Sequence, residues 1–153
     1  MATSPAELRQ LLHLYGIERD RLRAAISQLA GLTLTDLDAL EHLEVHGSQT
    51  QRVLGERLLL TSGGVTVLVD RLERGGWVQR RQHPTDRRAV LVGLRPDMPV
   101  DRLAALEDFH ASITSAAARL SPAERDAAAS FLERVAHSAA SAEAELRKVS
   151  PRR

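Results

Sequence analysis

Hydrophobic residues recur at intervals of three and four along both ends of the chain, which is the spacing of amphipathic helices. The first predicted helix begins at residues 4–7, where Ser-Pro-Ala-Glu combines an N-cap serine, a proline and a capping-box glutamate. Its apolar stripe consists of Leu8, Leu11, Leu12, Tyr15, Leu22, Ile26 and Leu29. The same tetrapeptide at 121–124 predicts the start of a second long helix, and a third is predicted from about Val100 to Leu120.

The helix that follows residue 124 carries an apolar stripe that we expect to be buried. The stripe consists of Phe131, Leu132, Val135, Ala136 and Ala139. Three long helices are too few to enclose a core by themselves. We therefore expect them to pack against a second copy of the chain.

The middle third contains three shorter helical patterns. Thr35 is expected to cap the first, which ends at Gly47. Residues 48–51 fit a capping box for a second, short helix. Thr61 is expected to cap the third, which two glycines at 75–76 bring to an end. The apolar positions of this third helix are Val65, Leu68, Val69 and Leu72.

After residue 76 the pattern changes from helical to extended. Two runs of strand-forming residues, 77–83 and 88–94, flank a polar tip that contains Pro84 and Asp86. Such runs around a turn predict a β-hairpin. Helix, short helix, helix and hairpin is the order of a winged helix-turn-helix. The predicted fold class is mainly α with a small β-hairpin wing, a winged helix-turn-helix plus a helical dimerisation region.

We expect three segments along the chain. Residues 1–32 form an N-terminal dimerisation helix, residues 33–96 form the winged helix-turn-helix lobe, and residues 97–153 form C-terminal dimerisation helices.

The composition of the 153 residues excludes several functions. The chain has no cysteine, so it has no disulfide, thiolate nucleophile, Cys-ligated zinc or cysteine redox sensor. No apolar run approaches the roughly 20 residues of a membrane span, and the N-terminus lacks the apolar centre of a signal peptide. We expect a soluble cytoplasmic protein with no membrane partner.

The distribution of charge is more informative than its sum. The formal net charge of +1 by itself argues against nucleic acid as a partner. Between Gln49 and Arg95, however, nine arginines and four acidic residues give a local charge of +5, while the remainder carries −4. We call residues 49–95 the basic module. A basic module with this order of elements predicts double-stranded DNA as a partner.

In a helix-turn-helix, the second helix enters the major groove with its N-terminal residues nearest the bases. Hydroxyl groups at Ser62 and Thr66 can bind bases or phosphates, and Val67 can contact a thymine methyl group. The glycines at 63–64 either allow a close approach to DNA or merely form a loose first turn. The predicted DNA contacts of this helix are Thr61, Ser62, Gly63, Gly64, Thr66, Val67, Arg71 and Arg74.

The hairpin carries a second set of predicted DNA contacts, Arg81, Arg87 and Arg88. Two arginines at the tip of a thin projection fit the minor groove, whose narrow A·T-rich stretches attract arginine. Asp86 is expected to pair with a neighbouring arginine and so stabilise the shape of the wing. A merely solvated turn explains less well why so many arginines gather on one hairpin.

Two motifs carry a resemblance to a known family. Residues 69–73, Val-Asp-Arg-Leu-Glu, lead to a glycine, and residues 86–88, Asp-Arg-Arg, form the tip of the hairpin. Together with Leu-Thr-Ser-Gly-Gly-Val-Thr at 60–66 and the helix start at 120–124, they make the chain resemble the MarR family of multiple-antibiotic-resistance-type transcriptional regulators. The resemblance covers nearly the whole chain.

The resemblance implies a homodimer in which the first and the last two helices form the interface. Each subunit would present one recognition helix and one wing to a pseudo-palindromic operator. The resemblance also implies a pocket for a small-molecule effector, of unknown identity, between the dimer region and the DNA-binding lobe. We expect the regulator to act as a repressor.

The histidines are candidates for a metal site or for the effector pocket. His42 and His46 stand at i and i+4, a spacing that can chelate a metal, and His110 lies on a helix that could pack nearby. Because the chain has no cysteine and no second histidine one turn from His110, we expect no metal and no cofactor. These three, with His13 and Tyr15, are candidate pocket residues, and the alternative for His13 and Tyr15 is packing in the dimer interface.

The sequence does not favour an enzyme. It contains no nucleophile elbow and no glycine-rich phosphate loop after a strand. The alternative to a DNA-binding regulator is a helical dimer that binds a small molecule or metal and uses its winged module for protein contacts.

Overall fold

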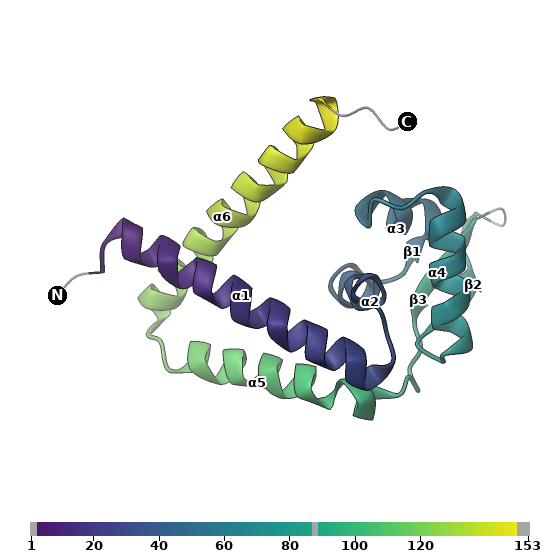
Figure 1. The fold of residues 1–153 in the computed structure, drawn as a ribbon, viewed down its shortest axis with the longest axis horizontal. Helices are drawn as coiled ribbons and strands as arrows, with labels where there is room; N and C mark the ends of the chain where they lie inside the picture. The colour runs from purple at the N-terminus through teal and green to yellow at the C-terminus, as the bar shows by residue number, and fades with distance from the viewer. Residues whose placement is uncertain (1–2, 87–88, 150–153) are drawn as a thin grey trace. The chain divides into compact units, whose positions relative to one another are not determined.

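The computed structural model describes residues 3–86 and 89–149 (Figure 1). The chain divides into two compact units, Met1–Glu107 and Asp108–Arg153. The fold is mostly helical with one small antiparallel sheet, which confirms the predicted fold class.

The first unit begins with α1 (Pro5–Ala30), α2 (Leu34–His46), β1 (Gln49–Thr50), α3 (Gln51–Arg57) and α4 (Ser62–Arg74). The hairpin β2 (Val78–Gln82) and β3 (Val90–Leu94) follows, and then a 3-10 turn, η1 (Val100–Leu103). The helix α5 (Ala104–Ala118) starts in the first unit and continues into the second, which also holds α6 (Pro122–Val149).

Both predicted Ser-Pro-Ala-Glu helix starts are confirmed. The Ser4 hydroxyl accepts a hydrogen bond from the Glu7 amide, and the Glu7 carboxylate accepts one from the Ser4 amide. Ser121 and Glu124 make the same reciprocal pair. Each pair satisfies two amide groups that a helix start would otherwise leave without partners.

Two predicted caps in the middle of the chain were wrong. The N-cap of α2 is Thr33 and not Thr35, because Asp36 three residues later completes a reciprocal capping box with Thr33. The N-cap of α3 is Thr50 and not Ser48. Thr50 ends a strand that pairs with β3, so the chain is still extended at the point where a Ser48 cap would begin a helix.

The sheet has the strand order β1-β3-β2, with both pairings antiparallel. The predicted hairpin is confirmed, with Val78 opposite Leu94 and Gln82 opposite Val90. The short strand β1 was not predicted, because two residues are too few to show an alternating pattern. A Cβ on Gly93 would lie 2.2 Å from the Ser48 hydroxyl oxygen, so a larger residue at this position of β3 would have to displace the Ser48 side chain.

The core of the first unit lies where α2, α3 and α4 meet the sheet. Its fully buried side chains include Leu37, Leu54, Leu72, Val78 and Val92. The four positions predicted to face inward on α4 are all buried, which confirms its predicted orientation. On the other side of α2, Arg23 of α1 is buried and ion-pairs with Asp38 and Glu41.

The described part of the second unit contains no buried residue. The stripe predicted to be buried on α6 is therefore not covered within this chain, and the side chain of Leu132 is 55% exposed. The helix predicted from Val100 to Leu120 is a 3-10 turn followed by an α-helix that ends at Ala118. Such 3-10 turns are frequent at helix starts. No helix within the described ranges is both long and apolar enough to span a membrane.

Candidate nucleic-acid interface

The helix α4 exposes the side that was predicted to contact DNA. Thr61 caps it by accepting a hydrogen bond from the Gly64 amide, which confirms the predicted cap. Ser62, Thr66 and Arg74 are exposed, and Val67 is 60% exposed although it is apolar. The Thr66 hydroxyl donates to the Ser62 carbonyl oxygen at 2.9 Å, so towards a ligand it is available as an acceptor.

The two glycines of α4 differ in their surroundings. A Cβ on Gly63 would meet no atom within 4 Å, so this position borders open space. A Cβ on Gly64 would lie 3.3 Å from the Thr61 hydroxyl oxygen, against the cap itself. Gly63 is thus the position at which another molecule can approach the α4 backbone most closely.

One predicted contact residue, Arg71, forms an ion pair with another residue of the chain. Its Nε and Nη2 atoms donate to both carboxylate oxygens of Asp36, with an Nη2–Oδ1 distance of 2.6 Å. Asp36 is 1% exposed. Burial opposes its ionisation, but hydrogen bonds from Arg71 and Thr33 outweigh burial and hold the pKa of Asp36 below its ordinary value.

A second arginine of the basic module, Arg80, links the wing to α4. Its guanidinium ion-pairs with Asp70 and with Glu73, and its backbone amide donates to Glu73 at 3.2 Å. Two of the four acidic residues of the basic module are therefore directed at one arginine of β2. This arrangement fixes the first wing strand against the C-terminal half of α4.

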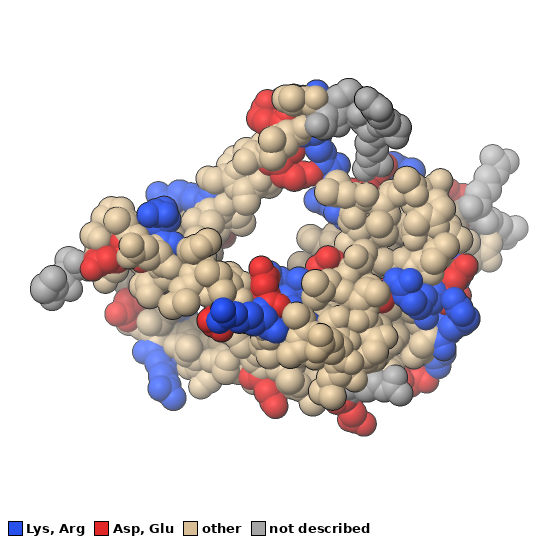
Figure 2. Space-filling model, in the orientation of Figure 1, with Lys and Arg blue, Asp and Glu red and all other residues tan. Residues whose placement is uncertain are grey.

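Three described arginines of the basic module form no ion pair: Arg57, Arg74 and Arg81. All three are exposed, and Figure 2 shows basic side chains over the region of α4 and β2. Arg74 and Arg81 were predicted contacts, whereas Arg57 was missed. The sequence does hold a signal for Arg57: no acidic residue stands three or four positions away to pair with it on a helix. Arg52, by contrast, has Glu56 at i+4 and is paired with it.

The tip of the wing is only partly described. Arg87 and Arg88 lie outside the described residues. Asp86, the predicted wing-stabilising residue, is exposed, and its amide donates to Nδ1 of His83 at 3.2 Å. The Thr85 amide donates to the same nitrogen, so the His83 ring organises the turn. This role of His83 was not predicted, because a hydrogen bond to backbone amides leaves no pattern along the sequence.

The five candidate pocket residues come from three helices, α1, α2 and α5. On α2, the rings of His42 and His46 lie 4.4 Å apart, and burial together with the charges of His46 and Arg57 lowers the pKa of His42. On α1, His13 lines an open groove with Leu12 and Ile17, and Tyr15 is exposed. His110 belongs to the second unit. Within the described ranges, no three His, Cys, Asp or Glu side chains form a group that could hold a metal ion.

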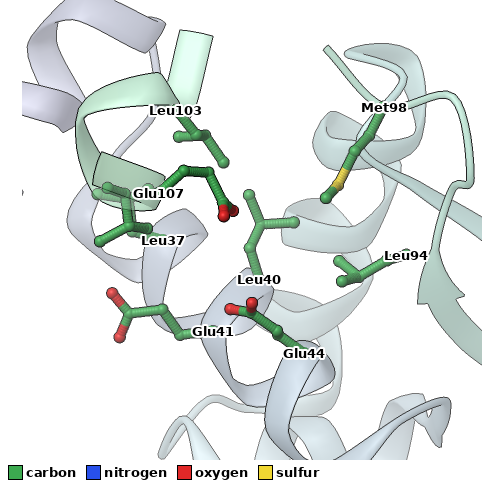
Figure 3. A pocket seen from close by; sticks show the side chains of 9 residues that line it. Leu37, Leu40, Glu41, Glu44, Leu94, Met98, Leu103 and Glu107 are labelled. Atoms are coloured by element: carbon green, nitrogen blue, oxygen red, sulfur yellow. The ribbon is translucent and has the colours of Figure 1, made fainter. Parts of the chain in front are cut away.

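The first unit also contains a small, mainly apolar cavity of about 30 Å³ (Figure 3). Its lining residues are Leu37, Leu40, Glu41, Glu44, Leu94, Met98, Leu103, Leu106 and Glu107. Pockets that hold drug-sized ligands have volumes of about 300–1,000 Å³. The cavity as it stands has room for about one water molecule, and none of the five candidate pocket residues lines it.

Comparison with known proteins relates the middle of the chain to a family of transcriptional regulators. Residues 30–89 match the model of the MarR family. The HTH-type transcriptional regulator YkoM of Bacillus subtilis is 40% identical over 97 residues, which cover 63% of this chain and 62% of YkoM. The multiple antibiotic resistance protein MarR of Salmonella typhimurium is 32% identical, over 59% of this chain and 62% of that protein.

Each alignment thus spans about three fifths of the curated relative. A solved structure of a mutant S. aureus MepR bound to an oligodeoxyribonucleotide has the same fold, with a TM-score of 0.55 at 20% identity over 86% of this chain and 96% of that one. These relatives are transcriptional regulators and not enzymes. Over its winged helix-turn-helix, residues 30–89, the chain thus matches the MarR family, and the relatives that it resembles over about three fifths of their length are transcriptional regulators.

Proposed function

We propose that this protein is a sequence-specific DNA-binding transcriptional regulator that acts as a homodimer on a pseudo-palindromic operator. The observation that carries the proposal is a set of exposed arginines around α4, Arg57, Arg74 and Arg81, that form no ion pair with any described residue. Arginines without an acidic partner are free to bind phosphate groups. The oligonucleotide bound to the related MepR protein supports the same assignment.

The predicted DNA contacts that remain exposed and described are Thr61, Ser62, Gly63, Thr66, Val67, Arg74 and Arg81. To these we add Arg57. Gly64 is half-buried, and Arg71 is paired with Asp36. Arg87 and Arg88 complete the proposed interface at the tip of the wing.

Homodimer formation is supported by the exposed apolar side chains of the terminal helices. On α1, Leu11 is 58% and Leu14 is 53% exposed, and α6 has no buried residue. Large exposed apolar patches mark surfaces of association. A second copy of the chain would cover these side chains and would place a second recognition helix beside the first.

We further propose that the regulator is a repressor whose affinity for DNA is modulated by a small molecule. The match of residues 30–89 to the MarR family supports this, with His13, Tyr15, His42, His46 and His110 retained as candidate pocket residues. Because the cavity beside Leu40 is small, a drug-sized effector would require the surrounding helices to separate or a second subunit to complete the site.

The test uses the double-stranded DNA immediately upstream of the protein's own gene, which we call the upstream duplex. We expect fluorescence anisotropy to show binding that weakens steeply with salt, because phosphate contacts release counterions. Arg74→Gln and Arg81→Gln should each weaken binding and reduce the slope of log K against log salt by about 1. Arg21→Gln, which removes an exposed charge from α1, is the control and should leave both unchanged.

Wild-type protein that does not bind at low salt, or binds with no dependence on salt, would contradict the proposal. That result would favour the alternative, in which the winged module contacts other proteins.

A further inference from the structure

Asp36 is a buried carboxylate that has two tasks. In the first turn of α2 it accepts hydrogen bonds from the Thr33 amide at 2.9 Å and the Thr33 hydroxyl at 2.8 Å. From the other side it accepts hydrogen bonds from Nε and Nη2 of Arg71. One carboxylate thus closes the cap of α2 and holds an arginine of the recognition helix, 35 residues further along the chain.

The ion pair is not needed to anchor α4. Four side chains of this helix, Val65, Leu68, Val69 and Leu72, are already buried in the core. Removing a carboxylate from water is costly, and a buried ion pair often contributes little net stability compared with apolar packing. The pair between Asp36 and Arg71 therefore calls for an explanation other than the docking of α4.

The geometry of Arg71 supplies that explanation. Asp36 engages the Nε–Nη2 edge of the guanidinium, while Nη1 has no hydrogen-bond partner among the described residues. The Arg71 side chain is 44% exposed although its partner is buried. Residues seven and four positions earlier in a helix lie on the same side, so Arg71 shares its side of α4 with Gly64 and Val67.

We propose that Asp36 is a positioning residue for DNA binding: it orients Arg71 so that the free Nη1 edge meets a phosphate of the DNA backbone. This inference rests on the proposed function. A free arginine side chain must lose rotamer freedom when it binds, and one that is already held loses less. A planar guanidinium presents separate edges to two partners in a fixed geometry, whereas the ammonium group of lysine is a single point charge with no such edges.

The proposal makes a prediction opposite to that of simple charge counting. Asp36→Asn removes a negative charge beside the DNA-binding surface, so long-range electrostatics alone would strengthen binding. If Asp36 acts by orienting Arg71, the substitution should instead weaken binding to the upstream duplex about tenfold. Arg71→Gln should weaken it to a similar extent.

A double-mutant cycle separates positioning from a general loss of structure. In the Arg71→Gln background, Asp36→Asn should cause no further loss of affinity, because the group that it orients is gone. Thr33→Ala is the matched control: it removes the other side-chain donor to Asp36 and weakens the α2 cap, but leaves the ion pair in place. Its affinity should remain that of the wild type, at a temperature at which circular dichroism shows every variant to be folded.

Arg71→Lys provides a second measurement that does not alter Asp36. It keeps the positive charge and lacks the second edge, so it should bind as weakly as Arg71→Gln. Three results would each overturn the role of Asp36. The first is wild-type affinity in Arg71→Lys, and the second is tighter binding in Asp36→Asn. The third is a loss of affinity from Asp36→Asn that is equal in the wild-type and Arg71→Gln backgrounds. Wild-type protein that does not bind the upstream duplex would overturn the proposed function and this inference with it.

Discussion

Arginine supplies all but one of the basic side chains, yet the arginines of the basic module are not equivalent. Arg71 and Arg80 form ion pairs with carboxylates of the same chain, whereas Arg57 and Arg74 form no ion pair with any described residue. Both Nη groups of Arg80 are directed at carboxylates, so Arg80 adds less to phosphate binding than an arginine with a free Nη group, because binding must disturb an existing pair. The sum of charges therefore overstates the number of phosphate contacts available.

Leu59 illustrates how backbone conformation at one residue affects stability. It lies in the turn between α3 and α4 with φ of 58°, in the left-handed region that residues with a Cβ rarely adopt. Its side chain is 60% exposed, so packing does not explain the choice of residue. We infer that this turn stores backbone strain.

A pair of substitutions tests the strain at Leu59. Leu59→Ala and Leu59→Gly lose the same side-chain contacts, but only glycine relieves the left-handed strain. We expect Leu59→Gly to be the more stable variant by about 1 kcal/mol in urea denaturation, the reverse of the usual order of alanine and glycine. Equal stability, or a more stable Leu59→Ala, would show that the turn is not strained.

At the scale of elements, α4 is held on two flanks. Arg71 connects one flank to α2, and Asp70 and Glu73 connect the other to Arg80 of β2. These positions are separated by roughly 100–160° around the helix axis at 3.6 residues per turn. Between the flanks lies the exposed strip that carries Val67 and Arg74.

The connection to the wing can be tested by hydrogen exchange. Arg80→Gln removes the charge that holds β2 against α4, and we expect faster amide exchange in Val78–Gln82, because local opening becomes easier. Arg81→Gln, one residue along the same strand, is the control, because Arg81 has no ion pair with any described residue. Unchanged exchange in Arg80→Gln would mean that the backbone pairing with β3 alone stabilises the strand.

Most elements could be predicted from the sequence because their signals are local. The apolar spacing of α4, the Ser-Pro-Ala-Glu starts and the change of pattern at Gly76 all involve residues within a few positions of one another. Two caps were placed wrongly because several threonines and serines near each start satisfy the same pattern. Which of them caps the helix depends on its surroundings, as the pairing of Thr50 with β3 shows.

The whole molecule contains one unit with a core and one without. The described part of Asp108–Arg153 has no fully buried side chain, so its apolar residues gain little from burial within this chain. Leu132 and Leu146 on α6 are 55% and 70% exposed. This is the strongest physical reason to expect that the protein functions as an assembly of two chains.

Leu132→Asp tests that expectation. A charge placed in an apolar interface should raise the dissociation constant of the dimer about tenfold or more in sedimentation equilibrium. Val67→Asp is the matched control, because Val67 is similarly exposed but lies on the side of α4 assigned to DNA. A wild-type protein that is monomeric at all concentrations, or a dimer disrupted only by Val67→Asp, would contradict the proposed interface.

The sequence by itself determined the order of the elements, the inward face of α4 and the concentration of arginine in residues 49–95. These properties depend on spacing and composition, which are read along the chain. Only the tertiary structure decided which arginines are available, because pairs such as Asp36–Arg71 join residues 35 positions apart. Burial of a carboxylate and the fork geometry of a guanidinium depend on how helices pack, and no local pattern encodes that packing.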